Sequence, residues 1–104
     1  MTNINRQYEW TLEAYEQQGN LWIRWTTNAP FRPKQGQIHV YNNEVFPDNP
    51  QDQTKKWTWD NLNNTPWDTG LAWGSGWHCA YIAEKYEDQG GSNWSYRYLE
   101  QVVT

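Results

Sequence analysis

Polar and apolar residues alternate with a period of two along most of the chain, which is typical of half-buried β-strands. Residues 8–14 and 21–27 are the clearest cases, and the sequence QQGN between them predicts a turn. The two stretches therefore predict an antiparallel hairpin. The residues expected to face the interior are Tyr8, Trp10, Leu12 and Ala14 in the first strand and Leu21, Ile23 and Trp25 in the second, with Trp22, Arg24 and Thr26 on the opposite face.

Further strands are predicted at 37–42, 55–60, 76–87 and 94–103, separated by segments rich in Pro, Gly, Asn and Asp. Residues 60–77 are expected to be mainly loop. Six or seven short strands predict an all-β chain that folds as a small antiparallel β-sandwich of immunoglobulin-like size. A small barrel is the alternative. With 104 residues, we expect one domain that spans residues 1–104.

Three of these segments carry more specific expectations. Ile38 and Val40 are expected to face inward, and Trp57 and Trp59 share one face of their strand, which regular alternation assigns to the core. Residues 78–88 also match helical spacing, but the glycines that flank them favour a strand.

The composition indicates a folded chain whose interior is built largely from aromatic rings. Nine Trp, seven Tyr and two Phe make 17% of the residues aromatic, although the mean hydropathy is only -1.11. Disordered chains are poor in aromatic residues because they bury little apolar surface. The net charge of -4 argues against binding to nucleic-acid phosphates and against docking on anionic lipid by charge alone. Neutral partners remain.

The sequence contains no motif that predicts catalysis or metal binding. His39 and His78 are the two histidines and Cys79 is the single cysteine. Within a strand, His78 and Cys79 point to opposite faces, so they do not form a metal pair. There is also no phosphate-binding loop, no GxSxG and no HExxH. We therefore expect neither an enzyme nor a bound metal or cofactor, and we expect Cys79 to be a small buried hydrophobic residue.

Several tryptophans lie in turn-rich segments, where side chains more often serve binding than packing. Short polar side chains surround these rings. An aromatic plate beside carboxamides and carboxylates suits a neutral sugar, because the ring covers the apolar C–H face and the polar groups bond the hydroxyls. The alternative is that the rings pack down as a lid while the polar residues form turns. The candidate ligand-binding residues are Asp60, Asn61, Asn63, Trp67, Asp68, Trp73, Trp77, Trp94 and Tyr96.

These observations favour a lectin-like protein that binds a neutral carbohydrate or glycoconjugate. Single sugar sites are weak, so we expect a homo-oligomer that pairs sites, joined through the aromatic outer face of an edge strand. A membrane-interface or toxin-like protein and a protein-interaction or inhibitor domain are the alternatives. In composition the chain is similar in kind to small microbial and fungal lectins and to small β-rich cytolysins, but no motif transfers residue roles from either group. The start MTNINRQYEW lacks an apolar segment. We therefore expect no signal peptide, and a cytoplasmic location or release by a non-classical route.

Overall fold

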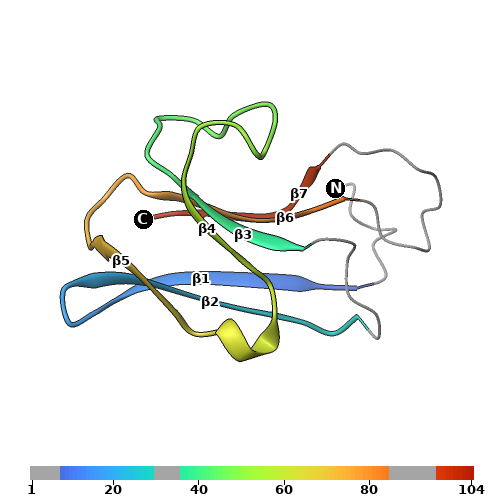
Figure 1. Ribbon diagram of the computed structural model, residues 1–104, viewed down its shortest axis with the longest axis horizontal. Coiled ribbons are helices and arrows are strands. Elements are labelled where there is room, and N and C mark those ends of the chain that lie inside the picture. Colours follow the sequence, from blue (N-terminus) through green and yellow to red (C-terminus); the bar gives the residue numbers. More distant parts are fainter. Residues whose placement is uncertain (1–7, 30–35, 85–95) are drawn as a thin grey trace.

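The computed structural model describes residues 8–29, 36–84 and 96–104, and their strands form two antiparallel sheets that pack face to face (Figure 1). The strands are β1 (Trp10–Gln17), β2 (Asn20–Thr27), β3 (Gln37–Tyr41), β4 (Thr54–Trp59), β5 (Trp67–Ala72), β6 (His78–Ala83) and β7 (Arg97–Val103). One sheet has the order β1-β2-β5 and the other has the order β4-β3-β6-β7. The predicted small antiparallel β-sandwich is confirmed, because the described strands form two separate sheets rather than a closed barrel.

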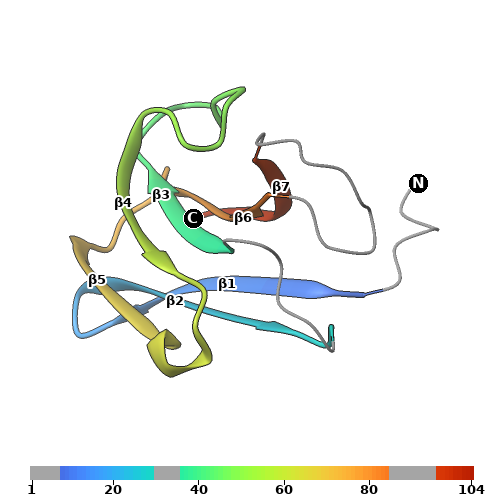
Figure 2. The ribbon, with the colours of Figure 1, turned by 45° about the vertical axis from the view of Figure 1, so that its right-hand side comes forward.

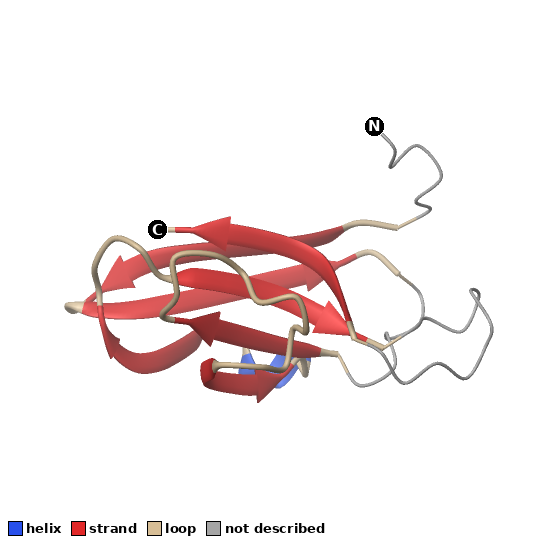
Figure 3. Ribbon diagram, turned by 90° about the horizontal axis from the view of Figure 1, so that it is seen from above, coloured by secondary structure: helices blue, strands red, loops and turns tan. Residues whose placement is uncertain are grey.

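The core lies between the two sheets, which lie one above the other in Figure 1 and overlap when seen from above in Figure 3. Both strands of the predicted hairpin contribute the expected faces, since Leu21, Ile23 and Trp25 are fully buried and Trp10 lies against them. From the other sheet, the inward residues are Ile38, Val40, Cys79, Tyr81, Ala83 and Leu99. The turn between β1 and β2 is closed by Gln18 and Gly19, whose φ values of 55° and 83° suit a tight hairpin turn.

Strand β6 is buried on both faces. Its outward residues Ala80 and Ile82 form a second apolar cluster with Tyr41, and this cluster is partly covered by Phe46. The segment that contains Phe46 is held in place by two tyrosine hydroxyls. Tyr41 donates to the carbonyl of Pro50, and Tyr98 donates to the carbonyl of Pro47. The strand interpretation of residues 78–83 is confirmed over the helical one, and residues 85–88 lie outside the described part of the chain.

Two expectations from the sequence are wrong. The 60–77 segment is not mainly loop, because it contains a short 3-10 helix, η2 (Leu62–Asn64), and the edge strand β5. Periodicity does not reveal β5, since Gly70 interrupts it with a φ of 78° and its pairing with β2 is irregular. Trp57 and Trp59 also do not lie in the core.

Trp57 and Trp59 point outward because of the register between β3 and β4. They lie opposite His39 and Gln37, whereas the inward residues Val40 and Ile38 lie opposite Lys56 and Thr58. Alternation shows that the two rings share a face, but the pairing partner decides which face that is.

Strand β4 lies at the margin of its sheet, next to β5 of the other sheet (Figure 2). The Lys56 ammonium donates to the carbonyl of Thr69, which links the two edges. Among the residues that the structure describes, no helix has the length and apolar character needed to cross a membrane.

Candidate functional site

The outer face of β4 presents two large rings to solvent. Trp57 is 43% exposed and Trp59 is 45% exposed, and neither packs into a core cluster. Their ring centroids are 5.0 Å apart and the ring planes cross at 80°, so together they form an L-shaped aromatic surface. Exposed apolar surface of this kind marks interaction sites, because leaving it in water has an energetic cost.

His39 supports this surface from behind. Its imidazole stacks on Trp57 with centroids 5.7 Å apart and planes only 17° from parallel. Both ring nitrogens are engaged, Nδ1 with the Thr54 hydroxyl at 2.8 Å and Nε2 with Oε1 of Gln37 at 2.6 Å. His39 is 3% exposed, and burial lowers the pKa of its imidazole to about 4. The ring behind Trp57 is therefore fixed in place and uncharged at neutral pH.

The 3-10 helix η2 is tied back against the end of β4. The Asn64 carboxamide donates to the Thr58 hydroxyl and to the carbonyl of Trp59, both at 3.2 Å. This leaves Asn61 and Asn63 exposed just beyond Trp59. Among the described residues, neither carboxamide has a hydrogen-bond partner. We call the set of Trp57, Trp59, Asn61 and Asn63 the tryptophan edge.

Asp60, another predicted site residue, is buried inside the joint between β4 and η2. Its carbonyl accepts the indole N–H of Trp25 at 3.1 Å, and its Oδ2 accepts the Tyr81 hydroxyl at 2.7 Å. Its own N–H donates to the carbonyl of Gly36 at 3.1 Å. Asp60 therefore holds the base of the tryptophan edge and offers no exposed surface for a ligand.

The other predicted site residues are not brought together. Trp67 and Trp77 are half-buried against the core, and the Trp77 indole donates to the carbonyl of Ala72 at 3.0 Å. Trp73 is 40% exposed but lies beside the β1–β2 turn, where its N–H donates to the carbonyl of Gly19. These positions separate Trp73 from η2 by the length of β5 (Figure 1).

Asp68 lies on the outer face of the other sheet, where Asn20 donates to it at 3.1 Å. Tyr96 lies on the β4–β3–β6–β7 sheet, and its hydroxyl accepts from Gln37 at 3.4 Å. Trp94 lies outside the described residues. Of the predicted site residues, Asn61 and Asn63 are therefore the two exposed ones that directly follow β4 in the chain, and Tyr96 is hydrogen-bonded to Gln37, which supports His39.

Reasoning from the sequence missed the two most important rings and their support. The signal was present, since Trp57 and Trp59 alternate in a short strand next to asparagines that were proposed as ligand-binding residues. What it lacked was any sign of the register with β3, which turns both rings outward. Gln37 and His39 were missed for the same reason, because only the register places them beside Trp59 and Trp57 on the neighbouring strand.

The chemistry available at the tryptophan edge is stacking and neutral hydrogen bonding. Cys79 lies on the inner face of β6, and burial raises the pKa of its thiol to about 12. Within the described ranges, no group of three or more His, Cys, Asp or Glu side chains is placed to hold a metal ion. No protein-family model, curated protein or solved structure matches this chain.

Proposed function

We propose that this protein binds carbohydrate, and that the tryptophan edge is where a neutral sugar stacks. The observation that carries the proposal is the pair of outward, nearly perpendicular indoles on β4, a strand followed directly in the chain by two exposed asparagines. A pyranose has an apolar face of C–H groups and a rim of hydroxyls. One indole would lie under the apolar face, the second would flank it, and Asn61 and Asn63 would donate to and accept from the rim.

The support behind the rings favours binding because it reduces what must be ordered when the sugar arrives. Trp57 is already held by its stack on His39, whose two nitrogens are fixed by Thr54 and Gln37. Freezing a mobile side chain on binding costs about 0.5–1.5 kcal/mol, and a pre-positioned ring avoids much of this. The uncharged imidazole also adds no preference for a charged ligand.

The expected affinity is low. An indole presents about 200 Å² of surface. Covering half of that area at about 25 cal/mol per Å² contributes roughly 2.5 kcal/mol for each ring. The two rings together contribute about 5 kcal/mol, and the loss of translational and rotational freedom offsets at least about 4 kcal/mol of this, so one site is expected to bind more weakly than about 1 mM. Useful binding then needs several sites that act together, which is the reason to propose a homo-oligomer or a multivalent chain.

The test is a glycan array followed by ligand-observed NMR with the oligosaccharides that bind. Trp57→Ala and Trp59→Ala are each expected to weaken binding by about tenfold or more, since each removes one stacking ring. Trp73→Ala is the matched control, because Trp73 is exposed to a similar extent but lies beside the β1–β2 turn. It is expected to bind like the unaltered protein.

Two outcomes would overturn the proposal. One is that the protein binds no glycan on the array. The other is that glycan binding persists in both tryptophan variants while the chain still folds. Neutral liposomes without sugar headgroups provide the remaining comparison, because exposed indoles also suit a membrane interface. Sedimentation with such liposomes, unaffected by excess free sugar, would favour the membrane alternative.

A further inference from the structure

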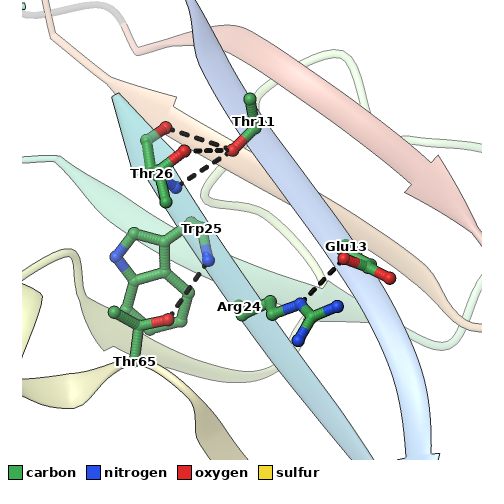
Figure 4. Close-up of polar contacts among 6 residues, drawn as sticks. All are labelled: Thr11, Glu13, Arg24, Trp25, Thr26 and Thr65. Atoms are coloured by element: carbon green, nitrogen blue, oxygen red, sulfur yellow. Dashed lines mark hydrogen bonds and ion pairs between the residues drawn. The ribbon is translucent and has the colours of Figure 1, made fainter. Parts of the chain in front are cut away.

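An open groove of about 500 Å³ crosses the outer face of the β1–β2–β5 sheet, on the layer opposite the tryptophan edge. It lies where the pairing of β5 with β2 ends at Ile23, after which the Thr65 hydroxyl accepts the N–H of Trp25 at 3.2 Å. Its polar lining consists of Thr11, Glu13, Arg24, Thr26 and Thr65 (Figure 4), and we call it the threonine groove. Its volume lies within the usual range for small-ligand sites.

The polar groups of the groove are arranged across β1 and β2 in two steps. Thr11 and Thr26 lie opposite each other with their hydroxyl oxygens 2.5 Å apart, and Glu13 lies opposite Arg24. The Nε of Arg24 donates to Oε1 of Glu13 at 2.8 Å, and the guanidinium carbon lies 4.9 Å from the ring centroid of Tyr15. Both charged side chains are 56% exposed, and these two contacts direct the guanidinium toward Glu13 and Tyr15.

Much hydrogen-bonding capacity remains unused. In the described part of the chain, nothing bonds to the two terminal nitrogens of Arg24 or to Oε2 of Glu13. The Thr65 hydroxyl accepts from Trp25 but still has its own proton to donate. The groove thus offers donors and an acceptor at several directions within one concave surface, as a polyhydroxylated ligand requires.

The charges within the groove balance. Glu13 and Arg24 form an ion pair whose members stabilise each other, so the hydrogen bond to Arg24 lowers the pKa of Glu13 and the hydrogen bond to Glu13 raises that of Arg24. The pair has no net charge near neutral pH, which gives neither an anion nor a cation an advantage. This balance favours a neutral ligand.

We infer that the threonine groove is a second site for a neutral sugar, which makes a single chain bivalent. The bivalency rests on the proposed function of the tryptophan edge, whereas sugar binding in the groove is inferred from the groove residues alone. Because the two sites lie on opposite sheets, one chain would cross-link two glycans that no single face could reach together. The avidity that weak sites need would then not require a homo-oligomer.

The experiment is a titration of the full chain, followed in ¹H–¹⁵N spectra, with maltose, cellobiose, lactose and diacetylchitobiose. Binding at both sites would shift two separate sets of backbone amides, one around Thr11 and Thr65 and one around Trp59. Arg24→Ala is expected to weaken the first set about tenfold, because it removes a charged hydrogen-bond donor, and to leave the second set unchanged. Trp59→Ala is expected to do the reverse.

Two further variants separate binding from folding. Arg24→Lys keeps the positive charge but loses the planar fork, so it is expected to weaken groove binding while the dispersed spectrum of the folded chain is kept. Glu16→Ala removes an exposed carboxylate of β1 outside the groove and is the matched control. Beads coated with the bound sugar should be cross-linked by the unaltered protein and by Glu16→Ala, but not by Arg24→Ala or Trp59→Ala.

The outcomes distinguish the two proposals. Shifts around Trp59 alone would overturn the second site and leave the proposed function standing. Shifts around the threonine groove alone would support the groove, overturn the bivalency and refute the tryptophan edge. Groove shifts that persist unchanged in Arg24→Ala would refute the assignment of the groove.

Discussion

Substitution of Gly36 by alanine should destabilise the joint that carries the tryptophan edge. An added Cβ at this position would lie 2.2 Å from Oδ2 and 2.6 Å from Cγ of Asp60. No side chain tolerates such a contact, so the Asp60 carboxylate must move. The movement would remove Asp60 from the Tyr81 hydroxyl, which donates to it at 2.7 Å in the buried interior.

The expected size of the effect follows from two destabilising contributions and one stabilising contribution. A hydrogen bond to a charged group contributes about 1.5–3 kcal/mol. Overpacking of a tight site adds about 1–3 kcal/mol. Alanine also stabilises by about 0.4–1 kcal/mol because it restricts the unfolded chain. We therefore expect Gly36→Ala to lower the free energy of unfolding by about 2–4 kcal/mol.

Urea unfolding followed by tryptophan fluorescence measures this change. The indole of Trp25 is hydrogen-bonded to the carbonyl of Asp60, so its fluorescence reports on the joint between β4 and η2. Gly74→Ala is the matched control. No atom of the described residues comes within 4 Å of an added Cβ there, and the φ of Gly74 is outside the left-handed region. Equal unfolding midpoints for the two variants would refute the reasoning, as would a Gly36→Ala penalty that stays the same when Asp60 is also changed to alanine.

Three further predictions concern single side chains. Burial holds the pKa of His39 near 4, whereas a histidine in the unfolded chain titrates near 6.5. The free energy of unfolding should therefore fall by roughly 3 kcal/mol as the pH drops from 6.5 to 4. Unfolding experiments on His39→Gln should show that this part of the pH dependence is lost. Cys79 is buried with its pKa raised to about 12, so iodoacetamide should modify it only in denaturant, and rapid modification of the native chain at neutral pH would contradict this placement. Thr69→Val should cost about 1–2 kcal/mol in thermal or urea unfolding, because the Thr69 hydroxyl bonds the carbonyl of Leu21 at 2.7 Å inside the protein; an unchanged stability would mean that this bond contributes nothing.

Local alternation was enough to predict the class of fold. It placed Leu21, Ile23 and Trp25 on one face and Trp22 and Arg24 on the other, as the structure has them. A period of two is a property of each strand by itself, and the turn at Gln18 and Gly19 is equally local. These features do not depend on which strands later become neighbours.

The functional surfaces could not be predicted in the same way. Trp57 and Trp59 were expected inside, yet they are exposed because β4 pairs with β3 in a register that sets them against His39 and Gln37. Asp60 was expected to bind a ligand, yet Tyr81 and Trp25, distant in sequence, enclose it. Each assignment depended on partners that only long-range pairing brings close.

The amino-acid sequence therefore determined which side chains lie together on each strand and that the chain is built from antiparallel strands, and it favoured a sandwich over a barrel. The tertiary structure decided which of those faces is covered. In the described part of the chain it left the indoles of Trp57 and Trp59 exposed on the outer face of β4 and a polar groove on the opposite layer. The physical reason is that the direction of a side chain follows from two neighbouring residues, whereas its burial depends on what the whole chain packs against it.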